Sequence, residues 1–204
     1  MNPPEQVAAV SAILSELGLP ATLLSQLLGH ALAVEQDADR LGLISSRDIG
    51  AVLSRHTADS LLFAIAREPL EGEHWVDVGS GAGFPGLVLA CCYPATHFTL
   101  VEPQARRAGF LDLQCSRYGL ANVALAVTRA ADLEPRFDVA TARALAEPAI
   151  ALETLHRLAP LGTVLLAVGG SAVAPSGVED LDVSRPGVDS PGRIFKMSQV
   201  VGGA

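Results

Sequence analysis

Hydrophobic residues near the start of the chain recur with the period of an α-helix. The run begins at Glu5 and is interrupted by Gly18 and Pro20. Within it, apolar side chains return every three or four positions, at Val7, Val10, Ile13, Leu14 and Leu17. This spacing predicts an amphipathic helix that ends near Gly18.

Two more helices are expected before the pattern changes. One runs from Ala21 to about Arg40, and another is capped by Ser54 and stops at Pro69. No strand pattern occurs in this region. We therefore predict a helical N-terminal extension over residues 1–72, which closes at the polar turn Glu71-Gly72-Glu73.

Short β-rich runs then alternate with helical stretches. The strand candidates are uninterrupted apolar runs, as in a parallel sheet that is covered on both faces; they are HWVDVG, HFTLVEP, VALAV, FDVATARA and TVLLAVGG. Residues 178–183 and 193–198 are expected to pair as a hairpin. The prediction is an α/β fold of Rossmann-like, doubly wound type over residues 73–204, with a mainly parallel sheet, a C-terminal antiparallel hairpin and the N-terminal helical extension.

Composition and charge narrow the classes of function. The chain has 204 residues, half of them hydrophobic, with 4% aromatic residues and a net charge of −8. A chain of this length is expected to form one hydrophobic core. The small number of aromatic side chains argues against a surface on which nucleic-acid bases stack. The negative charge disfavours general binding to DNA or anionic membranes, although a local basic patch is compatible with it. We expect a monomer with neither DNA nor membrane partners.

Three cysteines, Cys91, Cys92 and Cys115, are too few and too apolar in context for a disulfide framework or a zinc site. No metal site is predicted, and Cys91 and Cys92 are expected in the core. The N-terminus lacks a basic signal region, and no apolar run reaches the ~18 residues that span a bilayer. These features predict a soluble protein of the reducing cytoplasm.

The densest chemical signal is the sequence DVGSGAGFPG over residues 77–86, between a strand ending at Val78 and a helix starting at Gly86. Glycines allow the positive φ and the close approach that a ligand above a strand end requires, and the next helix would offer free N–H groups. Gly81, Gly83 and Gly86 have the spacing of the dinucleotide fingerprint, but the match is weak because it starts one register late relative to the end of the strand. The register Asp77, Gly79, Gly81, Gly83 is that of the cofactor loop of S-adenosylmethionine (SAM) methyltransferases.

Glu102 follows the next strand, 25 residues after Asp77. An acidic side chain at this edge accepts hydrogen bonds from both hydroxyls of a ribose. NAD and SAM sites share the feature, so Glu102 supports an adenosyl ligand without choosing between them.

Three segments and one upstream motif together resemble the RsmG (GidB) family, bacterial enzymes that use SAM to methylate N7 of a guanine in small-subunit (16S) ribosomal RNA. The segments are residues 77–90 (DVGSGAGFPGLVLA), 100–111 (LVEPQARRAGFL) and 137–144 (FDVATARA), with Arg55-His56 and Asp59-Ser60 upstream. The resemblance spans about residues 35–170.

The resemblance implies a set of site residues. Asp77, Gly79, Gly81 and Gly83, with Ser80 and Phe84 in the same loop, would line the methionine end of SAM. Glu102 would bind its ribose, and the backbone at Ala130 and Ala131 its adenine. Arg143 would bind the cofactor and face the target, and His56 would lie with Asp59 and Ser60 at the mouth of the active site. Arg143 and His56 would be the catalytic residues.

Three positions depart from the family's usual pattern. Ala131 stands where a glutamate is common, and Gly42 or Leu43 where an asparagine is usual. Val168 replaces a lysine near the target, which removes a cation that would bind RNA phosphate. The departures leave the cofactor site intact and weaken the expected grip on RNA.

Other interpretations stay open at this point. Arg143 is equally placed to contact the target or to pair with Glu147 one helical turn later. Spacings of four put Arg55 with Asp59, and His56 with Ser60, on adjoining stripes of one helix face, so these residues also fit a helix cap with one ion pair. A diverged small-molecule methyltransferase and a non-catalytic SAM-binding relic are alternatives to the RNA enzyme, and an NAD enzyme fits the glycine register less well.

Overall fold

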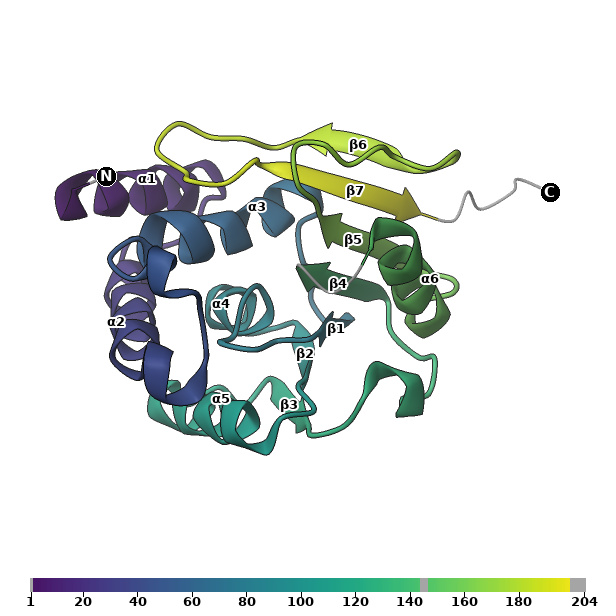
Figure 1. Cartoon of the computed structure of the whole chain (residues 1–204), viewed down its shortest axis with the longest axis horizontal. Coiled ribbons are helices and arrows are strands. Elements are labelled where there is room, and N and C mark those ends of the chain that lie inside the picture. Colours follow the sequence, from purple (N-terminus) through teal and green to yellow (C-terminus); the bar gives the residue numbers. More distant parts are fainter. Residues whose placement is uncertain (1, 144–146, 199–204) are drawn as a thin grey trace.

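A computed structural model describes residues 2–143 and 147–198 of the protein. Its centre is a seven-stranded sheet in the order β3-β2-β1-β4-β5-β7-β6 (Figure 1). β1 to β5 are parallel, β7 is antiparallel to β5, and β6 is antiparallel to β7. The strands are β1 (His74–Val78), β2 (His97–Val101), β3 (Val123–Ala126), β4 (Val139–Arg143), β5 (Thr163–Ala167), β6 (Glu179–Asp182) and β7 (Arg193–Ser198).

Helices cover both faces of this sheet. Figure 1 shows α3, α4 and α5 on one side and α6 on the other, with α1 and α2 in a further layer over the side of α3, α4 and α5. The helices are α1 (Pro3–Glu16), α2 (Leu23–Leu41), α3 (Ala58–Ala66), α4 (Gly86–Cys92), α5 (Ala105–Tyr118) and α6 (Pro148–Leu158). The fold is the predicted Rossmann-like α/β architecture, with its C-terminal hairpin.

The central strands carry apolar side chains on both faces because each face lies in a core. In β5, Leu165 packs towards α3 and α4, whereas its neighbours Val164 and Leu166 pack towards α6. All three side chains are at most 2% exposed. Because successive residues of a strand point to opposite faces, a strand covered on both faces does not show the alternation of polar and apolar residues that a half-exposed strand shows.

The N-terminal helices join the same core as the glycine-loop side of the sheet. Asn2 caps α1 in a capping box with Glu5, and α2 ends at Gly42 in the left-handed conformation. Val10, Leu27 and Leu61 from the three helices are fully buried in one cluster with α4. The division of the chain at residue 72 remains a prediction.

The start of the third helix differs from the prediction. Ser54 is not an N-cap: its hydroxyl lies 3.3 Å from Oε1 of Gln6 and 3.3 Å from the carbonyl of Ala51. Helical structure already begins before Ser54, with the π-turn η2 (Leu53–Thr57), closed by a bond from the N–H of Ala58 to the carbonyl of Leu53. The wider turn changes which side chains share a face.

The C-terminal hairpin returns to the N-terminal helices through its connecting loop. The N–H of Asp189 donates to the carbonyl of Ser54 at 3.1 Å, and Arg185 pairs with Glu16 of α1 at 2.7 Å. The loop thus borders the carboxyl edge of the sheet. In the described ranges, 2–143 and 147–198, no helix has the length and apolarity needed to cross a membrane.

Candidate functional site

The loop from β1 to α4 is built on glycines in the left-handed region. Gly79, Gly81 and Gly83 have φ of 75°, 54° and 97°, as the sequence predicted. A Cβ on Gly83 would lie 2.9 Å from the Cβ of Leu87, whereas one on Gly81 would meet nothing nearer than 3.7 Å. Gly83 is therefore needed for packing, and Gly81 borders open space where a ligand can approach.

Asp77 lies below this loop with 1% of its surface exposed. One of its oxygens accepts the N–H of Gly86 at 3.0 Å, and Thr141 Oγ1 lies 3.4 Å from the other. Burial raises the pKa of Asp77 to about 6, against the lowering effect of these donors. The side chain fastens the first turn of α4 to β1.

The expectation that α4 presents free N–H groups to a ligand is wrong. The N–H of Gly86 is bound by Asp77, and those of Leu87 and Val88 donate to the carbonyl of Gly83. The tight loop folds back on its own helix, so these donors are used within the chain.

Glu102 stands at the end of β2, where the sequence placed it. Its carboxylate accepts the N–H of Gly81 at 3.1 Å and the N–H of Gln104 at 2.8 Å, and the residue is 3% exposed. These two bonds orient the carboxylate at the edge of the sheet beside the glycine loop.

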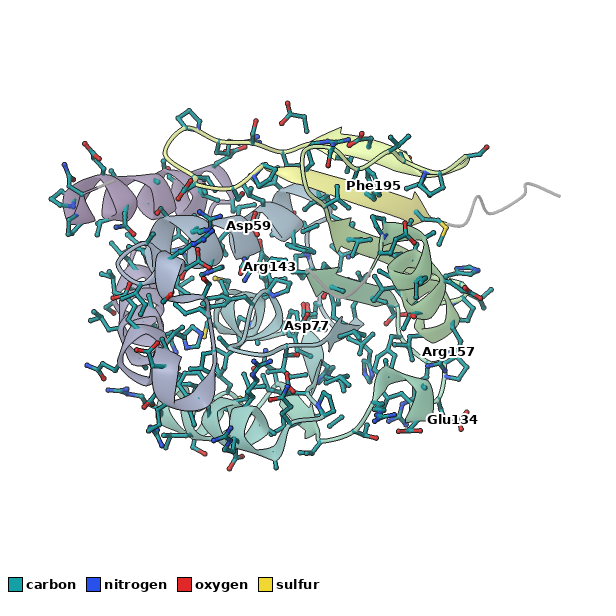
Figure 2. All side chains as sticks on the ribbon, in the orientation of Figure 1. Asp59, Asp77, Glu134, Arg143, Arg157 and Phe195 are labelled. Carbon is teal, nitrogen blue, oxygen red and sulfur yellow. The ribbon has the colours of Figure 1, made fainter. Side chains whose placement is uncertain are left out.

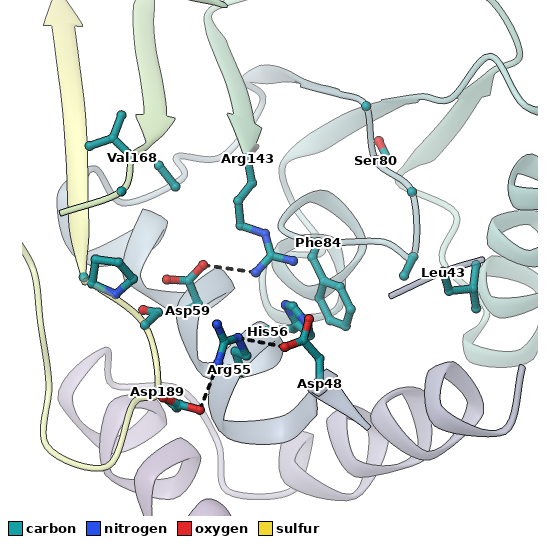
Figure 3. A pocket seen from close by; sticks show the side chains of 18 of the residues that line it. Leu43, Asp48, Arg55, His56, Asp59, Ser80, Phe84, Arg143, Val168 and Asp189 are labelled. Carbon is teal, nitrogen blue, oxygen red and sulfur yellow. Dashed lines mark hydrogen bonds and ion pairs between the residues drawn. The ribbon is translucent and has the colours of Figure 1, made fainter. Parts of the chain in front are cut away.

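Two cavities adjoin at the carboxyl edge of the parallel strands. The smaller, of about 370 Å³, is bordered by Glu102, Gln104 and Ala130. The larger, of about 530 Å³, lies over Ser80 and Gly81 and extends to the loop that contains Asp189 (Figure 3). Gly79, Arg107 and Arg143 line both cavities, so the two form one elongated site of a size typical for ligand binding.

Arg143 extends from the end of β4 into the larger cavity. Its Nη1 lies 3.2 Å from Oδ2 of Asp59 on α3, and its guanidinium is 5.3 Å from the ring centre of Phe84 (Figures 2 and 3). The alternative pairing with Glu147 is wrong, because the Glu147 carboxylate accepts the N–H of Ala149 and caps α6.

His56 stacks on the same aromatic ring. Its ring centre is 5.3 Å from that of Phe84, and its Nε2 is 3.4 Å from Oδ2 of Asp48. Burial, reinforced by the charge of Arg143, lowers the pKa of His56 to about 4. The imidazole is therefore neutral at physiological pH and serves as a wall of the cavity.

Arg55 and Asp59 do not pair with each other, although their spacing had suggested it. Each makes a longer-range ion pair instead. Arg55 pairs with Asp48 at 3.0 Å and with Asp189 at 3.4 Å, while Asp59 pairs with Arg143. The π-turn at residues 53–57 sets Arg55 and Asp59 out of the ordinary helical spacing. Ser60 keeps its expected relation to His56, because its hydroxyl donates to the His56 carbonyl at 2.7 Å.

The turn after β3 forms the far wall of the smaller cavity. Ala130 borders that cavity, whereas its neighbour Ala131 is not among the lining residues. Arg157 of α6 donates to the carbonyl of Leu133 at 2.9 Å and also to that of Ala130. Arg157 thereby holds the turn, a role that sequence spacing did not reveal because the residues are 27 positions apart.

The departures at residues 43 and 168 fall on the larger cavity. Leu43 and Val168 both line it, and Val168 is 9% exposed. Arg193 also lines the cavity, but it pairs with Asp180 and donates to the carbonyls of Gly169 and Gly170. Arg107, within the family-like segment 100–111, also lines the cavity. Asp48 and Asp189 line it too and were missed, because only tertiary contacts bring them there.

The buried cysteines lie away from any metal chemistry. Cys91 and Cys92 are in the core as expected, and burial raises the pKa of each thiol to about 12. Among residues 2–143 and 147–198 no group of three or more histidine, cysteine or acidic side chains is arranged to hold a metal.

Comparison with known proteins identifies the family. Residues 24–177 match the model of the GidB family, described as rRNA small subunit methyltransferase G. A ribosomal RNA small subunit methyltransferase G of Clavibacter michiganensis is 37% identical over 145 residues, which cover 70% of this chain and 64% of the relative. That of Serratia proteamaculans is 33% identical over 176 residues, covering 84% of this chain and 81% of the relative.

Solved structures agree on the fold. A methyltransferase from Geobacter sulfurreducens superposes with a TM-score of 0.57 at 16% identity over 82% of this chain and 86% of that one. MtNAS in complex with SAM gives 0.58 at 16% identity over 94% and 77%. The last residue of the third family-like segment, Ala144, lies outside the described residues. On the family match and these relatives, the chain belongs to the rRNA small subunit methyltransferase G (GidB) family, a family of SAM-dependent methyltransferases.

Proposed function

We propose that this protein transfers the methyl group of SAM to N7 of a guanine in the 16S RNA of the small ribosomal subunit. The observation that carries the proposal is the pair of adjoining cavities, with the family's glycine loop and Glu102 on one side and Arg143 between them. The names of the relatives, all rRNA small subunit methyltransferase G, support the RNA substrate.

The residues at the edge of the sheet fit SAM. In our proposal the Glu102 carboxylate accepts the ribose hydroxyls, the turn at Ala130 borders the adenine, and the loop from Gly79 to Gly83 borders the methionine end. Open space beside Gly81 and the oriented carboxylate of Glu102 support this assignment. Asp77 acts indirectly, because its carboxylate is buried and holds α4 against β1.

The reaction requires the protein to align the reactants more than to transfer a proton. SAM supplies a methyl group on a positively charged sulfur. Guanine N7 has an in-plane lone pair and no proton, so its attack needs no general base. His56 fits such a mechanism as a neutral wall, since its pKa of about 4 leaves it uncharged at neutral pH. The rate enhancement then comes from holding N7 in line with the methyl group and from excluding water.

The charges around the larger cavity are compatible with RNA despite the net charge of −8. Four arginines line it, at positions 55, 107, 143 and 193, against three aspartates at 48, 59 and 189. Several of these charges neutralise each other in pairs. We expect the protein to act as a cytoplasmic monomer on the small subunit, with neither DNA nor a membrane as its partner.

A methyl-transfer assay tests the proposal. The purified protein is incubated with SAM labelled in its methyl group and with small subunits from a strain that lacks this enzyme. We expect label in the 16S RNA with the wild-type protein and none with Gly81→Val. Bound SAM with no label in the RNA would refute the proposal; label in a small-molecule extract would then favour a diverged enzyme, and its absence a SAM-binding relic.

A further inference from the structure

The ion pair between Asp59 and Arg143 lies in the wall of the larger cavity. Its side chains come from α3 and β4, 84 positions apart, and are 11% and 20% exposed. Figure 3 shows both directed towards the same space, beside Phe84. A single hydrogen bond, Nη1 to Oδ2, is found between them in the described part of the chain.

That single bond leaves hydrogen-bond acceptors on Asp59 and donors on Arg143 that a ligand can use. A carboxylate has two oxygens with about four acceptor positions, and a guanidinium has five N–H donors. The pair therefore presents an acceptor next to a donor, both held in a largely buried setting. Side chains that are already paired lose little further freedom when a ligand binds.

Guanine carries the complementary groups on adjacent atoms. O6 is an acceptor that lies between N7 and the donors N1–H and N2–H₂, whereas adenine has a donor in place of O6 and an acceptor at N1. We propose that Asp59 reads the guanine by accepting from N1–H and N2–H, while Arg143 donates to O6. This inference rests on the proposed function and makes Asp59 the residue that determines base specificity.

The reaction strengthens these contacts as it proceeds. The N7 lone pair forms the new bond to carbon, the carbon–sulfur bond breaks with its electrons going to sulfur, and the positive charge passes to the guanine ring. No proton leaves. As the ring becomes cationic its N1–H becomes a stronger donor, so the anionic Asp59 stabilises the transition state more than the ground state.

The same arrangement discriminates against the wrong base. Adenine would set its amino group against the Arg143 donors and its N1 lone pair against the Asp59 carboxylate. Sites built to hydrogen-bond one polar edge reject a mismatched edge strongly, because buried groups lose their partners. A pair that only holds the fold together would have no such preference.

The test compares guanosine and inosine at the nucleotide that the methylation assay identifies. Inosine keeps O6 and N1–H but lacks the N2 amino group. With reconstituted small subunits we expect wild-type kcat/KM to favour guanosine by about tenfold, the size of one hydrogen bond to a charged group. In Asp59→Asn this ratio falls to about threefold or less, and Asp59→Glu restores part of it.

The outcomes separate this inference from the proposed function. Wild-type protein that fails on guanosine subunits refutes the proposed function itself. Wild-type protein that is active but treats guanosine and inosine alike refutes the role of Asp59, as does an Asp59→Asn variant with an unchanged ratio. Asp48→Asn, in the same cavity, is the matched control and should leave the ratio unchanged; SAM affinity, measured by calorimetry, checks that each variant is folded.

Discussion

The carboxylate of Asp77 holds the backbone N–H of Gly86 at 3.0 Å and thereby joins the end of β1 to the start of α4. The approach is close enough that a Cβ on Gly86 would lie 2.7 Å from the Cβ of Asp77. The acidic residue of the glycine loop is thus an internal clamp. It shapes the surface on which SAM is proposed to lie without facing that surface itself.

Asp77→Asn should change how stability depends on pH. Burial raises the folded-state pKa of Asp77 from its ordinary 3.8 to about 6, so protonation favours the folded state. This contribution is complete below about pH 3.8 and is lost as the pH rises through 6. Urea unfolding should show wild type losing roughly 2–3 kcal/mol relative to Asp77→Asn between about pH 4 and 7.5.

The control for this comparison is Asp39→Asn, at an exposed position of α2. Its stability should run parallel to that of wild type across the whole range. Parallel curves for Asp77→Asn as well would contradict the effect of the buried carboxylate.

Gly81→Val should abolish SAM binding. Gly81 has φ of 54° and borders the open cavity, so a β-branched side chain would strain the backbone and fill ligand space. Gly72→Val is a matched control, because Gly72 has φ of 78° and a Cβ at that position would meet nothing within 4 Å. Calorimetry should show SAM binding in the control alone; equal loss in both variants would mean that backbone strain is the only cause.

Arg157→Met should weaken the binding of SAM, although Arg157 is not expected to contact SAM itself. The variant keeps an apolar stem but removes the donors to the carbonyls of Leu133 and Ala130, which loosens a wall of the smaller cavity. We expect SAM affinity to fall by about 1 kcal/mol, a five- to tenfold increase in Kd. Arg117→Met, on the exposed end of α5, should bind as wild type does. Unchanged affinity in Arg157→Met would show that the turn holds its shape without this residue.

Val168→Lys should increase the affinity for RNA and make it depend more steeply on salt. Val168 lines the larger cavity, so a lysine there adds a cation near the bound RNA. One more phosphate contact should steepen the plot of log affinity against log salt by about 0.7–0.9. Val173→Lys, at a side chain that is 84% exposed and outside the cavity lining, is the control. Equal slopes for the two variants would show that no phosphate passes near residue 168.

The strands were predictable from sequence, and the site only in part. Continuous apolar runs such as residues 163–167 identify buried parallel strands, and the alternating glycines indicate a loop with positive φ. The partners of Arg55 and Arg143 were not predictable, because they are chosen by tertiary contacts. Asp189 reaches Arg55 across 134 positions, and the π-turn removes the i,i+4 relation between Arg55 and Asp59.

The chemical identity of the product tests the proposed reaction most directly. Small subunits lacking the modification are treated with the protein and SAM, and their 16S RNA is digested to nucleosides and analysed by mass spectrometry against methylguanosine standards. We predict 7-methylguanosine, at one nucleotide of the RNA. Methylation of N1, of N2, of a ribose hydroxyl or of another base would contradict the proposed reaction.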